Sequence, residues 1–113
     1  MAGFPFWHVT LTVAGESVPE RDIARGLEAL SHDHPFLLSG RYGPDRAEVR
    51  YWEEAADAAS VAALALRLWD EHRAACGLPD WQVVGLEVVD RETFHHRGRV
   101  PMLPVSLVGV APF

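Results

Sequence analysis

Four segments of the chain carry apolar side chains in the pattern of β-strands. From Phe6 to Val13, apolar residues alternate with His and Thr, as in a strand that buries one face. Residues 36–42 and 47–53 predict two more strands, and the Gly-Pro-Asp-Arg segment between them has the composition of a hairpin turn. Residues 81–90 are rich in Val and predict the fourth strand.

Two helices are predicted by apolar residues that recur three and four positions apart. The first begins near Ser17, which has capping-box spacing to Glu20, and ends near His32 because a proline follows. The second covers residues 57–76, and Gly77 suits the left-handed conformation in which many helices end.

The order of these elements over residues 6–90, strand, helix, two strands, helix, strand, resembles the ferredoxin-like superfold with its βαββαβ order. The resemblance implies an α+β domain with a four-stranded antiparallel sheet in the order 4-1-3-2 and two helices on one face. We expect residues 1–90 to form this domain. The sequence does not decide which face of the second strand is buried, because apolar residues occur on both of its faces.

Residues 91–113 differ from the rest and are predicted to be a C-terminal extension. The segment 91–99 is polar, whereas 100–113 carries no charge and contains three prolines. A solvated tail is normally poor in apolar residues, so we expect an extended segment that packs on its own domain or on a partner chain. The residues predicted at such an interface are Met102, Leu103, Val105, Leu107, Val108 and Phe113.

The sheet face away from the helices is predicted to be neither cleanly polar nor apolar. If the helices cover Val9 and Leu11, the opposite face carries His8 and Thr10, and strand alternation adds Val83 from the fourth strand. A mixed face of this kind suggests a surface that something covers. Six residues are therefore predicted to bind a ligand or partner: His8, Arg50, Trp52, Glu87, His95 and His96.

Composition narrows the classes of function. The chain of 113 residues has a formal net charge of −6, which disfavours general binding to nucleic acid or to anionic membranes. All ten basic residues are Arg, as expected for a GC-rich bacterial genome. The single cysteine, Cys76, excludes an intrachain disulfide, and neither a signal peptide nor a membrane-spanning apolar segment is evident, so we expect a cytoplasmic protein with no membrane association.

Candidate chemistry in the sequence is sparse. The predicted fold gathers several histidines toward one end of the sheet, namely His8, His32, His34, His95 and His96. Their spacing matches no zinc motif, so we expect neither a metal nor a cofactor. Cys76 is a poor nucleophile, because a helix C-terminus disfavours the thiolate, and His72 is expected at the edge of the core.

These observations predict a non-enzymatic binding or assembly module. It would self-associate, as a homodimer, or bind a protein partner through the open sheet face and the C-terminal extension. One alternative is a small-molecule-binding protein or cofactor-independent enzyme of the dimeric ferredoxin-like barrel type. A second alternative is a binder of single-stranded nucleic acid similar to RNA-recognition domains, although Glu48 and Glu87 on the same face would repel phosphate.

Overall fold

Strand β1 (Phe6–Ala14) lies inside the sheet between two antiparallel neighbours, β3 (Arg46–Glu54) and β4 (Gln82–Asp90). The structure is a computed structural model and describes residues 3–34, 37–97 and 109–113. On β1, Val9, Leu11 and Val13 are buried on the face that the helices cover, as the alternating pattern predicts.

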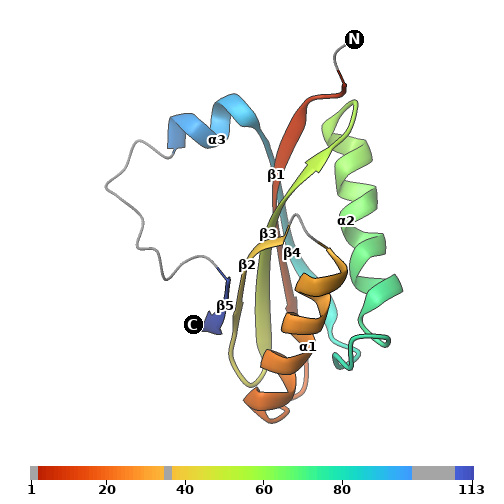
Figure 1. Ribbon diagram of the computed structural model, residues 1–113, viewed down its shortest axis with the longest axis vertical. Helices are drawn as coiled ribbons and strands as arrows, with labels where there is room; N and C mark the ends of the chain where they lie inside the picture. Colours follow the sequence, from red (N-terminus) through yellow and green to blue (C-terminus); the bar gives the residue numbers. More distant parts are fainter. Residues whose placement is uncertain (1–2, 35–36, 98–108) are drawn as a thin grey trace.

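Two further strands extend the sheet beyond β3 (Figure 1). Next to β3 lies β2 (Leu37–Tyr42), which is antiparallel to it, and β5 (Gly109–Pro112) runs parallel to β2. In the described ranges the sheet therefore has five strands in the order β4-β1-β3-β2-β5. A last backbone contact joins the Phe113 N–H to the Tyr42 carbonyl at 2.9 Å.

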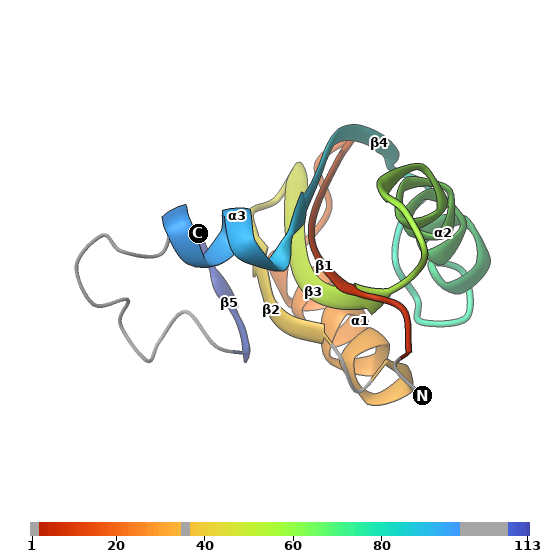
Figure 2. The same ribbon diagram turned by 90° about the horizontal axis from the view of Figure 1, so that it is seen from above.

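Two helices, α1 (Glu20–Asp33) and α2 (Ala58–His72), cover one face of the sheet (Figures 1 and 2). Helix α1 buries Ile23, Leu27 and Leu30, and α2 buries Val61 and Trp69. The Trp69 indole N–H donates to the Trp81 carbonyl at 2.7 Å, which satisfies the polar atom that this large side chain brings into the core.

A short third helix, α3 (Arg91–Arg97), lies on the other face, in contact with β1 and β4 (Figure 2). The Asp90 carboxylate accepts a hydrogen bond from the Thr93 backbone N–H at 2.6 Å and so caps the start of the helix. Glu92 in the first turn and basic residues in the last turn suit the helix dipole.

The predicted fold class is therefore wrong. The described chain has a five-stranded mixed sheet and three helices, where a four-stranded antiparallel sheet with two helices was expected. Both departures lie after β4. The outer edge of β2 would have carried unpaired backbone groups, which β5 satisfies, and the cap at Asp90 starts a helix in a segment that was predicted to be only polar.

Two helix boundaries also differ from prediction. Helix α1 starts at Glu20 after Pro19 and has no side-chain cap, so the expected capping box at Ser17 does not form. Helix α2 is capped by Asp57, whose carboxylate accepts from the Ser60 N–H at 2.8 Å, and it ends at His72. Turns follow α2 up to Gly77, which has a φ of 76°, as the sequence predicts.

A register shift in β4 corrects one assignment on the open face. The pairing with β1 is irregular between Thr12 and Val13, so that Val83 pairs with Val13 and packs against the core. Val83 was predicted on the opposite face; an extra residue in one strand reverses the side-chain alternation beyond it. In β2, Ser39 and Arg41 pair with residues of the open face.

Among the helices in the described ranges, none has the length and apolar character needed to cross a membrane.

Candidate functional site

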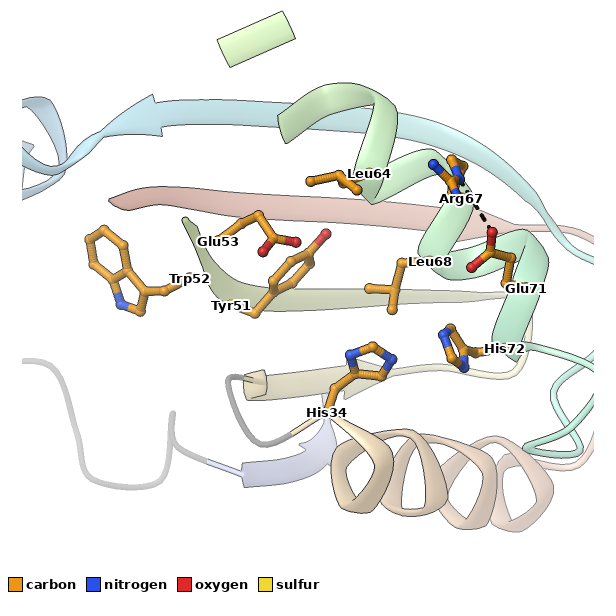
Figure 3. A pocket seen from close by; sticks show the side chains of 9 residues that line it. All are labelled: His34, Tyr51, Trp52, Glu53, Leu64, Arg67, Leu68, Glu71 and His72. Atoms are coloured by element: carbon orange, nitrogen blue, oxygen red, sulfur yellow. Dashed lines mark hydrogen bonds and ion pairs between the residues drawn. The ribbon is translucent and has the colours of Figure 1, made fainter. Parts of the chain in front are cut away.

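A cavity of about 170 Å³ lies on the helix-covered side of the molecule, where the end of α1, the face of α2 and the end of β3 meet (Figure 3). Nine residues line it: His34, Tyr51, Trp52, Glu53, Leu64, Arg67, Leu68, Glu71 and His72. An apolar cavity of about 150 Å³ can hold benzene, so this space suits a small organic molecule.

Regular structure positions the lining side chains. Tyr51 and Glu53 are two apart on β3 and therefore point to the same face of the sheet. The residues from α2 recur three and four positions apart, which places them on one side of that helix. His34 terminates α1, where its backbone N–H donates to the Leu30 carbonyl at 3.0 Å.

Two buried polar atoms in this cavity have no hydrogen-bond partner among the described residues. They are the Tyr51 hydroxyl and His34 Nε2. Tyr51 is only 6% exposed, so its hydroxyl has been removed from water without compensation. A buried polar group left in this state costs about 1–3 kcal/mol, and nearly all such groups in proteins have a partner. Both atoms belong to residues that line the cavity, and they are its candidate hydrogen-bonding groups for a ligand.

The ionisation of these groups follows from their surroundings. Burial, reinforced by the nearby Glu53 carboxylate, raises the pKa of the Tyr51 hydroxyl, which stays protonated and can both donate and accept. The pKa of His34 is lowered mainly by burial and to a smaller extent by His72, whereas Asp33 raises it. At neutral pH His34 is accordingly an uncharged imidazole.

The cavity is lined by two carboxylates, Glu53 and Glu71, and by one guanidinium group, Arg67. Arg67 and Glu71 form an exposed ion pair at 3.2 Å between Nε and Oε1, one helical turn apart at the rim. Glu53 has no ion pair with any other described residue. The Arg67 and Glu71 charges offset each other, so the lining has an excess of one carboxylate.

The opposite sheet face carries an aromatic cluster formed by His8, Trp52 and Phe94. The His8 ring stacks on Phe94 with 4.3 Å between centroids, and Trp52 meets both rings edge-on at 5.2 and 4.8 Å. His8 is 5% exposed, so α3 covers the end of the face on which a partner was predicted to bind. Burial and Arg50 lower the pKa of His8, against a smaller opposing effect of Glu87.

The other predicted binding residues lie along the same face. Arg50 pairs with Glu48 at 2.8 Å, and Glu87 pairs with Arg97 at 2.8 Å. His95 and His96 are exposed on α3. His95 and Trp52 also line a shallow cleft of about 330 Å³, together with Phe6 and Arg91.

The predicted tail residues are described only in part. Met102, Leu103, Val105, Leu107 and Val108 lie outside the described residues. Phe113 is 63% exposed beside the end of β2.

The histidines that were expected to gather at one end of the sheet lie on its two opposite faces. His34 lies against His72 on the helix-covered side, with 4.5 Å between ring centroids, whereas His8 and His95 lie near α3. In the described part of the chain, no group of three or more His, Cys, Asp or Glu side chains could hold a metal ion. Cys76 is buried, and burial raises the pKa of its thiol, as does the neighbouring Asp33.

Sequence reasoning missed most of the cavity, because its walls come from segments far apart in the chain. Trp52 and His34 were noticed, but as parts of other clusters, and His72 was placed at the edge of the core. One signal was available. Tyr51 brings a hydroxyl to the apolar face of β3, and His72 interrupts the apolar stripe of α2, so two polar side chains point toward the interior.

No curated protein matches the chain. The model of one protein family matches residues 6–102, which include the first four strands and all three described helices. The chain therefore belongs to the family of the domain of unknown function DUF8830.

Proposed function

We propose that this protein is a small-molecule-binding module and that its ligand occupies the cavity between α1, α2 and β3. The observation that carries the proposal is the Tyr51 hydroxyl, which is buried, unpartnered among the described residues and part of the cavity wall. A ligand that hydrogen-bonds to this group would remove a cost that the empty protein bears.

The composition of the wall supports ligand binding. Leu64 and Leu68 provide apolar surface, whereas Tyr51 and His34 provide polar groups. Binding sites for small molecules typically combine a mostly apolar wall with a few polar groups that orient the ligand. The proposal is one of binding and assigns no reaction to the nine lining residues.

A fragment screen by protein-observed NMR tests this proposal. We expect fragments of six to ten heavy atoms, about the size that the cavity admits, to shift the amide signals of His34, Tyr51 and Leu68. The variant Leu64→Trp should fill the cavity and abolish these shifts. Leu66→Trp is the matched control, because Leu66 is an exposed α2 residue that does not line the cavity.

Two results would refute the binding proposal. One is a screen in which no fragment moves the cavity signals. The other is a set of hits that bind Leu64→Trp as tightly as the parent protein.

Self-association is a second proposal, and the edge strand β4 supports it. Val84 is 58% exposed and Leu86 36% exposed on this strand, whose outer edge has no neighbour in the described sheet. Two copies of β4 could pair antiparallel around a two-fold axis and shield these side chains. The open sheet face and the C-terminal extension could contribute to the same contact.

We further propose a cytoplasmic location, which the single free thiol at Cys76 supports.

The solution mass tests self-association. By light scattering, the parent chain should have twice the mass of the monomer, and Val84→Arg, which places a charge on the edge, should be monomeric. A point substitution is preferable to removal of the C-terminus, because truncation would also remove β5 from the sheet. A monomeric parent chain at high concentration would exclude this second proposal.

A further inference from the structure

The chemistry of the cavity narrows the class of ligand. We infer that the cavity selects a small primary amine, bound as its ammonium ion by the Glu53 carboxylate and the Tyr51 hydroxyl oxygen, with its apolar group against Leu64 and Leu68. This inference rests on the proposed small-molecule binding and specifies its ligand.

The first argument is charge. Glu53 is the carboxylate of the lining that has no ion pair with a described residue, while Arg67 is already paired with Glu71. An anionic ligand would have to approach Glu53 without a free cation in the described wall to compensate it. A cationic ligand would instead supply the missing partner of Glu53 in a partly buried position, where charge-assisted hydrogen bonds are strong.

The second argument is the number and kind of hydrogen-bonding groups. Figure 3 shows the Tyr51 hydroxyl beside the Glu53 carboxylate, and the effect of Glu53 on Tyr51 agrees with this proximity. The carboxylate only accepts hydrogen bonds, and the hydroxyl oxygen and a neutral imidazole can both accept one. An ammonium group has three N–H donors and no acceptor, so it matches a wall whose free polar groups are acceptors.

The third argument is the surface around these acceptors. Tyr51 is part of the wall, and aromatic rings attract cations through their negative faces. Leu64 and Leu68 belong to the same wall on α2 and can pack against a ring or alkyl group (Figure 3). The site therefore fits an amine with a short apolar substituent better than a polar cation such as guanidinium alone.

Three ligands of one shape test the inference: benzylamine, benzyl alcohol and benzoate, each titrated into the full chain at pH 7 with the cavity amide signals as readout. We expect benzylamine to bind about tenfold more tightly than benzyl alcohol, and benzoate to bind least well. Glu53→Gln should weaken benzylamine about tenfold and leave benzyl alcohol unchanged. Glu54→Gln removes the same charge from the next residue, which does not line the cavity, and should have no effect.

The outcomes separate the inference from the proposal on which it rests. If none of the three ligands shifts the cavity signals, small-molecule binding fails together with the inference. If benzyl alcohol or benzoate binds as tightly as benzylamine, the cavity is a binding site but selection for an amine is wrong. An equal loss of benzylamine affinity in Glu53→Gln and Glu54→Gln also overturns the inference, because it shows a general effect of net charge. These comparisons use the parent chain first, so they do not depend on whether a variant folds.

Discussion

The His8 imidazole stacks on the Phe94 ring with 4.3 Å between centroids and 29° between the ring planes. His8 belongs to β1 and Phe94 to α3, so this contact holds α3 against the sheet. It also buries a titratable side chain that would otherwise face solvent on the open side of β1.

Removal of the Phe94 ring should loosen α3 and expose His8. We expect Phe94→Ala to lower the free energy of unfolding by about 1 kcal/mol, because the stacked pair and the contact with Trp52 are lost. Urea denaturation measures the change, and amide exchange in α3 should accelerate. His95→Ala is the control, since this exposed neighbour on α3 should change stability little. Equal effects of the two variants would contradict a fastening role for Phe94.

Burial of His8 should make the fold sensitive to mild acid. Its pKa lies below the ordinary value of 6.5, so the unfolded chain takes up a proton on His8 before the folded chain does. Stability should therefore fall as the pH drops below 6.5 toward the pKa of the folded protein. His8→Phe keeps a ring against Phe94 and should flatten this part of the stability–pH curve.

Thr10→Val serves as the control, because it alters the same face of β1 without removing a titrating group. Thermal unfolding between pH 5 and 7 gives both slopes. His34 has a lowered pKa as well, so some slope should persist in His8→Phe. An unchanged slope in that variant would contradict the assignment to His8.

Tyr51→Phe should stabilise the empty protein. The substitution removes a buried hydroxyl without a partner among the described residues and keeps the ring, so we expect the free energy of unfolding to rise by about 1 kcal/mol. Tyr42→Phe, which removes a hydroxyl not among the unpartnered buried groups, should give no such gain. If Tyr51→Phe instead destabilises the ligand-free chain, the hydroxyl has a partner in solution and the central observation for ligand binding is lost.

The cap of α2 should depend on the charge of Asp57. Its pKa is below the ordinary value of 3.8, chiefly because the carboxylate accepts a hydrogen bond from the Ser60 backbone N–H. This stabilisation is therefore present above pH 3.8 and is lost as the pH falls through the pKa of the folded protein. Asp57→Asn keeps a capping oxygen, whereas Asp57→Ala removes it.

Melting temperatures of the parent and both variants between pH 2.5 and 6 check this dependence. The advantage of the parent over Asp57→Asn should shrink in acid, and Asp57→Ala should be the least stable variant near pH 6. A constant difference between parent and Asp57→Asn at every pH would contradict a role for the charge.

The elements that the sequence predicted well have strong local periodicity. The alternation in Phe6–Val13 and the apolar stripe of α2 are visible within one short window; the strand forms where it was expected, and α2 lies within its expected range but ends at His72. The four-residue β5 has no such signal, because a strand this short is held by its pairing with β2. The bulge beside Val83 depends on pairing in the same way, so alternation alone could not show it.

The cavity was harder to predict than the fold. Its polar groups come from α1, β3 and α2, and only the packing of these elements makes Tyr51 and His34 neighbours of one space. Local patterns could show that Tyr51 faces inward. They could not show that its hydroxyl lacks a partner, because that depends on every other side chain nearby.

The two borders of the sheet differ in their ability to recruit another chain. β5 has four residues and contains Pro112, which lacks the N–H that a neighbouring strand would need, whereas β4 has nine residues and no proline. A sheet can extend from molecule to molecule without limit only if each molecule has two edge strands that can pair with another chain. We therefore expect a sheet with one long border and one short border interrupted by proline to stop growing after a single pairing at β4.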